Sequence, residues 1–163
     1  MQTIMMLEDK IKEVDLKIKE CAMKDEEIRG EIKLMITLPG VSFVSACNII
    51  AEIGSLKQYS AKELSALSGL APRIRESGSS VHSSFMSRRS SGRLRQILYL
   101  DSLVAVNKIP VLQEFHQRLL EKGKKKMTVR CACMRKILLI LRSIVVHQTP
   151  YRPDFSKKVI KSI

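Results

Sequence analysis

The sequence contains no tryptophan, only three histidines and only four cysteines among its 163 residues. Four scattered cysteines exclude a disulfide-stapled secreted scaffold and favour the reducing cytoplasm. The longest apolar run, near residues 137–146, contains Arg142 and is too short to cross a bilayer, and no signal peptide is present. A membrane-surface helix would need aromatic anchors that this sequence lacks. We therefore expect a cytoplasmic protein without a membrane partner.

Acidic residues are scarce after residue 36. Residues 1–36 hold 7 basic and 9 acidic side chains, whereas residues 37–163 hold 22 basic and 7 acidic ones, and the whole chain has a formal net charge of +13. A basic excess of this size favours a polyanionic partner, because neutralised phosphates release condensed counterions. Asp101 and Glu114 are too few to build a metal-binding carboxylate cluster, so we expect no metal site and no cofactor in this chain.

The first 36 residues carry a heptad pattern. Their apolar residues recur at alternating steps of three and four, at Ile4, Leu7, Ile11, Val14, Ile18, Cys21, Ile28, Ile32 and Met35. Only Asp25 interrupts this seam, at an a-type position. The pattern predicts one coiled-coil helix over Ile4–Met35 that packs on a second helix, and a homo-oligomer is the simplest source of that helix. The alternative is a helix that lies on the core of its own domain.

The remaining chain is typical of a mainly α fold. Apolar residues at helical spacing predict helices over 44–53, 61–68, 92–107, 111–122 and 127–147. Ser60 and Glu63 form a capping-box pattern. The apolar run around Tyr99 predicts a core position for this residue, and Cys131 and Cys133, with no histidine at a metal-ligand spacing, are expected to be buried small hydrophobic residues. Residues 69–91 should form a loop with a short extended piece near 80–86. We expect a coiled-coil helix at 1–36, a compact helical domain at 37–150 and an irregular basic tail at 151–163.

A Pro-Gly hairpin joins the first two of these helical regions. Pro39, Gly40 and Val41 stand between apolar helical segments, in the pattern of a helix-hairpin-helix that binds a DNA phosphate. Glycine permits a positive φ and a close approach of the backbone to a ligand, and the amides that open the following helix would face the phosphate. Such a contact is independent of base identity. A plain interhelical turn fits the same residues.

A loop rich in serine, glycine and arginine follows. Ser77 precedes Gly78 and follows Arg73 and Arg75, so arginines could hold a phosphate beside a candidate nucleophilic hydroxyl. Four further serines lie nearby, at Ser79, Ser80, Ser83 and Ser84, and composition alone does not select Ser77. A flexible, solvated Ser-rich loop is the competing interpretation.

Two basic stretches complete the candidate nucleic-acid contacts. The first leads into the predicted helix at 92–107 and contains Arg88, Arg89, Arg93 and Arg95. The second is the turn that contains Lys124, Lys125 and Lys126. Arginine and lysine suit phosphate contacts, although a solvated basic face has the same composition.

Several motifs in order resemble a known family. They are Leu38-Pro39-Gly40-Val41, Ala51-Glu52-Ile53-Gly54, Leu67-Ser68-Gly69-Leu70-Ala71-Pro72-Arg73, Ser77-Gly78, Met86-Ser87-Arg88-Arg89, Leu94-Arg95-Gln96-Ile97-Leu98-Tyr99-Leu100, Met134-Arg135-Lys136-Ile137-Leu138 and Thr149-Pro150-Tyr151. Together they resemble the C-terminal half of the insertion-sequence transposases that include the Piv pilin-gene invertase and bridge-RNA-guided recombinases. The resemblance covers nearly all of residues 37–155.

This resemblance implies a function and a catalytic residue. In the family an N-terminal domain supplies four metal-binding acidic residues, and the C-terminal domain supplies a serine that attacks DNA, which maps to Ser77. Some members choose their DNA with a bridging guide RNA and assemble as dimers or tetramers. The resemblance therefore implies a DNA partner, a guide RNA and a homo-oligomer for this chain.

The leading heptad helix resembles the coiled-coil segment that precedes this C-terminal domain in the family, so we expect no acidic domain within residues 1–36. Ser90 replaces a glycine that is usual after the basic triplet, and Ser83-Ser84-Phe85 lacks the glycine that is common after His82. We therefore expect a transposase fragment that is inactive alone, with Mg²⁺ needed only when an acidic domain is supplied. The alternative function is a non-catalytic DNA-binding remnant, or a regulator that pairs with an intact transposase.

Overall fold

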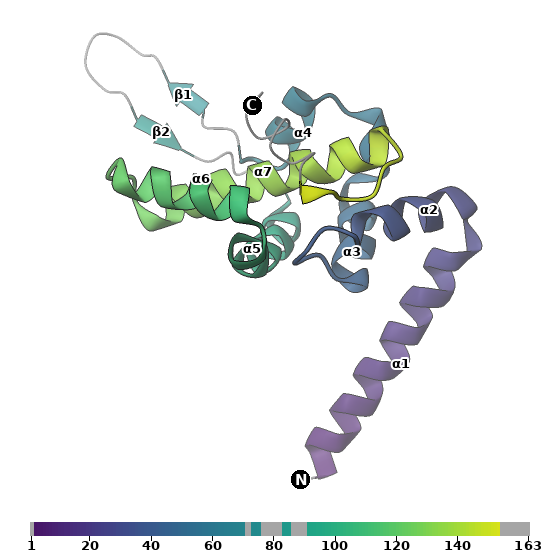
Figure 1. Ribbon diagram of the computed structural model, residues 1–163. Helices are drawn as coiled ribbons and strands as arrows, with labels where there is room; N and C mark the ends of the chain where they lie inside the picture. Colours follow the sequence, from purple (N-terminus) through teal and green to yellow (C-terminus); the bar gives the residue numbers. More distant parts are fainter. Residues whose placement is uncertain (1, 71–72, 76–82, 86–90, 154–163) are drawn as a thin grey trace.

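The computed structural model describes residues 2–70, 73–75, 83–85 and 91–153 and has a mainly α fold (Figure 1). Its elements are α1 (Gln2–Lys24), α2 (Glu26–Met35), α3 (Phe43–Ile53), a 3-10 turn η1 (Leu56–Gln58), α4 (Ala61–Leu67), β1 (Arg73–Arg75), β2 (Ser83–Phe85), α5 (Gly92–Lys108), α6 (Pro110–Glu121) and α7 (Lys126–Val146). The predicted fold class is confirmed.

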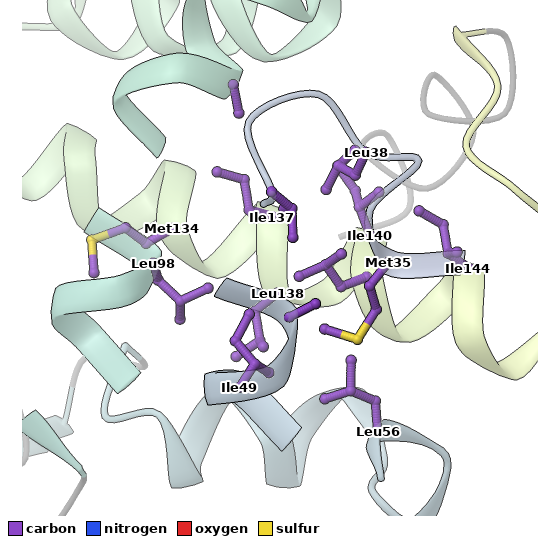
Figure 2. Packing of buried hydrophobic residues seen from close by; sticks show 14 of the residues in the cluster. Met35, Leu38, Ile49, Leu56, Leu98, Met134, Ile137, Leu138, Ile140 and Ile144 are labelled. Carbon is purple, nitrogen blue, oxygen red and sulfur yellow. The ribbon is translucent and has the colours of Figure 1, made fainter. Parts of the chain in front are cut away.

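Helix α7 is the centre of the core. Elements α2, η1, α4, α5 and α6 all contact it. Figure 2 shows Ile137, Leu138, Ile140 and Ile144 of this helix packed against apolar side chains from the surrounding elements. Those labelled are Met35, Leu38, Ile49, Leu56 and Leu98. One continuous core therefore joins α2 and the hairpin to the helices that follow.

The predicted N-terminal helix is interrupted at Asp25, which corrects the single helix expected over Ile4–Met35. Asp25 has an extended backbone, and its carboxylate accepts hydrogen bonds from the N–H groups of Glu27 and Ile28 at 2.8 and 3.1 Å. It therefore acts as the N-cap of α2, a position that aspartate favours. Figure 1 shows α1 extending away from the helical body, whereas α2 packs into it.

Most predicted helix ends are confirmed. The Ser60–Glu63 capping box is present, with both hydrogen bonds made. Gly54 ends α3 with a φ of +74°, and Pro110 opens α6 at its first turn. These agreements arise because caps depend on local hydrogen bonding and backbone geometry rather than on distant packing.

Two features of the later chain differ from the predictions. The extended piece predicted near 80–86 is confirmed by β2, but the structure adds β1, which pairs with β2 in antiparallel register with Arg73 opposite Phe85. Tyr99, expected in the core, is 38% exposed on α5. The apolar sequence around it misled the prediction because α5 leaves Leu100, Leu103 and Val104 exposed as well.

Of the two cysteines expected to be buried, one is fully so. Cys133 is buried and its burial raises the pKa of the thiol to about 11, whereas Cys131 is only half-buried and Cys21 is exposed. All four cysteines are free thiols. No helix in the described part of the chain is long and apolar enough to cross a membrane.

Candidate nucleic-acid interface

The Pro-Gly hairpin is fixed from beneath by the core and by α5. Leu38 is fully buried, Val41 is 7% exposed, and the Val41 N–H donates to the Leu38 carbonyl oxygen at 3.1 Å. Gly40 has a φ of +101°, and a Cβ built on it would lie 2.8 Å from Ala105 N and 2.9 Å from Asp101 O. The close backbone approach that glycine permits here is therefore made to α5.

This packing limits the number of backbone N–H groups with which the hairpin could bind a phosphate. Pro39 has no N–H, and the Val41 N–H is used inside the turn. The side chain of Val41 belongs to the core. A phosphate contact at this hairpin would therefore depend on the Gly40 N–H and on the first amides of α3, which also carry the positive end of the helix dipole.

A buried carboxylate links α3 to α5 behind the hairpin. Ser45 Oγ lies 2.7 and 2.6 Å from the two carboxylate oxygens of Asp101 and donates to them. Asp101 is only 5% exposed, and burial raises its pKa to about 6, although the hydrogen bond from Ser45 opposes the rise. An acid held in this way serves the helix contact rather than a metal ion or a substrate.

At the start of α5 a second carboxylate meets Ser91, the N-cap of the helix, and Arg93, one of the predicted contact residues. Glu52 of α3 accepts a hydrogen bond from Ser91 Oγ at 2.5 Å, and its other oxygen lies 3.8 Å from Arg93 Nη1. The Arg93 side chain is 74% exposed and available to a large ligand. Arg95 is half-buried, and its charge opposes the increase that burial causes in the pKa of Cys131.

The turn between α6 and α7 presents an exposed basic cluster. Gly123 has a φ of +71°, and the neighbouring lysines, Lys122, Lys124, Lys125 and Lys126, are all exposed. Within the described ranges none of these four lysines forms a salt bridge. We call Lys124, Lys125 and Lys126 the basic turn. Its charge is open to solvent and to anionic ligands.

Three carboxylates elsewhere in the fold form hydrogen bonds with serines. Asp101 is bound by Ser45, Glu52 by Ser91, and Glu63 by the Ser60 cap, which lowers the pKa of Glu63. Next to the basic turn, Glu121 at the end of α6 is exposed and accepts a hydrogen bond from Gln117. In the residues that the structure describes, no group of three or more His, Cys, Asp or Glu side chains could hold a metal ion. A Mg²⁺ site does not fit this part of the chain.

Four basic residues of α7 have structural roles that sequence reasoning missed. Arg130 donates to the Ser102 carbonyl oxygen at 3.1 Å, Arg135 to Ser65 Oγ at 3.1 Å, and Arg142 to the Tyr59 carbonyl oxygen. Lys136 Nζ lies 5.3 Å from the centre of the Phe115 ring. No acidic residue occurs between 126 and 146, so these cations have no partner of opposite charge on their own helix. This is the one sequence signal that they contact other elements of the fold.

The other predicted site residues are only partly placed. Arg73 and Arg75 lie on β1, whose backbone pairs with β2. Ser77, Arg88 and Arg89 lie outside the described residues. The structure therefore places the hairpin beside the middle and C-terminal turns of α5, and it places Arg93 and Arg95 at the first turn of this helix. These two groups of predicted contacts lie at different points along α5.

Comparisons with known proteins agree on one family. The family model described as "Transposase IS116/IS110/IS902 family" matches residues 32–117, from α2 to α6. The pilin gene-inverting protein of Moraxella bovis is 30% identical over 146 residues, which is 88% of this chain and 45% of that protein. An IS116 protein of Streptomyces clavuligerus is 27% identical over 158 residues, and an IS110 protein of Streptomyces coelicolor is 23% identical over 119 residues. The chain spans less than half the length of these relatives.

Proposed function

Because the chain belongs to the transposase IS116/IS110/IS902 family, we propose that it is the DNA-binding part of a transposase or site-specific recombinase. The observation that supports this proposal is the exposed basic turn at Lys124, Lys125 and Lys126, which forms no salt bridge among the described residues, within a chain of net charge +13. Arg93 and Arg95 at the start of α5 extend the basic contacts, and the hairpin amides add a phosphate contact that is independent of base identity.

We propose further that Ser77 is the nucleophile for strand transfer. Ser77 Oγ forms a bond to phosphorus while a phosphorus–oxygen bond to one sugar oxygen breaks. The proton lost by the serine hydroxyl is balanced by the proton that the departing sugar oxygen gains. The phosphodiester energy is kept in the serine–DNA ester, and no external energy source is needed. Arg73 and Arg75 would hold the phosphate and stabilise its developing charge.

The activity requires carboxylates that the described residues do not assemble. The metal-binding acidic domain of the family would supply Mg²⁺ for phosphate activation, and this chain's own residues would bind and orient the DNA. We infer that Ser77 acts only when such a domain is joined to the chain or supplied by a partner. A guide RNA would bind through the same basic residues, because their contacts are to phosphates.

The exposed seam of α1 supports self-association. Ile4, Leu7, Ile11 and Val14 are each more than half exposed on one face of this helix. We propose that two copies pair through this seam and form a homo-oligomer. The same seam would also let the chain pair with an intact transposase, and this favours regulation of such an enzyme as the second candidate function.

The DNA-binding proposal is tested by a salt titration of duplex DNA binding. The slope of log K against log salt is negative for such binding. Replacing Lys124, Lys125 and Lys126 with glutamine should reduce the magnitude of this slope by about 2–3, since each lost phosphate contact removes about 0.9. The matched control replaces Lys10, Lys12 and Lys17 of α1 and removes the same charge elsewhere. A wild-type chain without salt-dependent DNA binding would refute the proposal, and a parallel RNA titration tests the guide-RNA role.

The nucleophile is tested separately with the Ser77→Ala variant. In a chain joined to the acidic domain of a relative, the variant should form no covalent DNA adduct and should bind DNA with nearly unchanged affinity. The Ser79→Ala variant is the matched control. Strand exchange retained by Ser77→Ala would overturn the assignment, and a chain that binds DNA but never forms an adduct would favour the regulatory function.

A further inference from the structure

Ser91 is the N-cap of α5, and Glu52 of α3 lies against it. One carboxylate oxygen of Glu52 accepts the hydrogen bond from Ser91 Oγ at 2.5 Å. The other lies 3.8 Å from Arg93 Nη1. One acidic side chain thus engages both the residue before α5 and a predicted phosphate contact in its first turn. Nothing in the sequence motifs assigns Glu52 a role.

Ser91 uses its hydroxyl twice. It donates to Glu52, and it accepts from the Leu94 N–H at 3.2 Å as the N-cap of α5. A hydroxyl can donate once and accept twice, so both bonds are made together when the side chain holds one orientation. A short O–H···O⁻ contact is charge-assisted and roughly twice as strong as a neutral bond. Glu52 therefore selects the orientation of Ser91 that caps the helix.

Helix α3 holds Glu52 in a fixed position relative to α5. Ile49 and Ile53, on either side of Glu52 in sequence, are buried in the core, and Gly54 ends the helix directly after them. Further back along α3, Ser45 is bound to Asp101. Residues 45 and 52 of α3 thus meet Asp101 of α5 and its N-cap Ser91, so the two helices run antiparallel and are linked by polar bonds at two points.

We propose that Glu52 is a positioning residue for Arg93: through Ser91 it sets the point at which α5 begins, and it thereby fixes where Arg93 is presented to a nucleic-acid phosphate. This inference rests on the proposed DNA-binding function. Glu52 itself does not contact the ligand, because its two oxygens are turned to Ser91 and Arg93.

Two substitutions separate positioning from charge. Glu52→Ala and Glu52→Gln remove the same negative charge, but only glutamine keeps an oxygen that can accept from Ser91. Ser91→Ala and Ser91→Thr form a second pair, since threonine keeps the hydroxyl. We expect Glu52→Ala and Ser91→Ala to weaken duplex DNA binding by about three- to tenfold at a fixed salt concentration. This is the effect of losing one or two phosphate contacts. Glu52→Gln and Ser91→Thr should stay within twofold of wild type.

Amide hydrogen exchange of residues 92–96 gives a readout independent of DNA. Glu52→Ala should speed exchange there at least tenfold and leave α7 unchanged. All variants are compared where urea titration shows them fully folded, because a role confined to stability leaves DNA affinity unchanged under those conditions. Wild-type affinity or wild-type exchange in Glu52→Ala overturns the inference, and so does a glutamine variant as weak as alanine. A wild-type chain that binds no DNA refutes the proposed function instead, and the exchange comparison then still decides the role of Glu52.

Discussion

Gly40 shows that a glycine can be needed for either of two close contacts, with a bound phosphate or with a neighbouring helix. The sequence places glycine where a backbone could approach a phosphate, and the structure places the backbone of α5 on that side, 2.8 Å from where a Cβ would lie. Neither Ala105 N nor Asp101 O can move without shifting α5 itself. The glycine is therefore required by the fold, whatever the hairpin binds.

Gly40→Ala should reduce the free energy of unfolding by about 2–4 kcal/mol. The positive φ alone costs about 1–2 kcal/mol, and the overlap with the α5 backbone adds a term of similar size. Gly123→Ala is the matched control, because Gly123 has a φ of +71° but open space around it, and it should cost only about 1 kcal/mol. Urea titrations followed by circular dichroism compare the two, and equal losses would contradict the packing argument.

Asp101 should make stability depend on pH. Burial raises the pKa of this carboxyl from 3.8 to about 6, so the folded state binds a proton more tightly than the unfolded chain does. Its contribution is complete below pH 4 and is lost as the pH rises toward 6, by about 3 kcal/mol at 1.36 kcal/mol per unit. Asp101→Asn should remove this decline. The difference between the two urea-midpoint profiles from pH 4 to 7 isolates it, and parallel profiles would contradict it.

At the scale of the element, Asp25 separates two helices with different surroundings. A heptad pattern that continues across it cannot reveal the break, because Ile28, Ile32 and Met35 keep the same spacing while they turn from the seam to the core. Asp25→Ala should cost about 1 kcal/mol through loss of the α2 cap. Glu20→Ala on exposed α1 is the control and should change the urea midpoint little.

The seam of α1 makes a prediction about self-association. Ile11→Asp should weaken pairing of the chain at least about tenfold, since each copy would bury a charge in place of an isoleucine. Leu16→Asp is a matched control, because Leu16 is equally exposed, at 59% against 61%, but lies off the seam. Sedimentation equilibrium distinguishes the variants. A wild-type chain that is monomeric at high concentration would refute pairing through α1.

At the scale of the whole molecule, local signals predicted more than long-range ones. The Ser60–Glu63 box, Gly54, Pro110 and the turn at Gly123 were all predictable, because each depends on residues within one helical turn. The exposure of Tyr99 was not, since an apolar helix has no internal sign of which face the rest of the fold covers.

The sequence predicted which residues of the candidate site are basic, but it did not predict which side chains contact one another. The sequence identified Arg93 and the basic turn as candidate phosphate contacts, and the side chains of both are exposed in the structure. It could not show that Glu52 meets Ser91, a contact between residues 39 positions apart, or that Arg130, Arg135 and Arg142 bind neighbouring helices. Pairings of this kind depend on the antiparallel course of α3 along α5 and on the central place of α7.

The length of α1 determines how far apart two copies would stand. Its 23 residues span about 35 Å at 1.5 Å per residue, and Figure 1 shows the helical body at one end only. Two copies joined in parallel would hold their bodies side by side, with both Cys21 thiols facing across the seam and open to oxidative cross-linking. An antiparallel pair would keep the bodies about 35 Å apart, close to one turn of B-DNA, and would leave the thiols too distant to join. The direction of one helix pair would thus set the spacing at which a paired chain could hold two DNA segments, or two turns of one duplex.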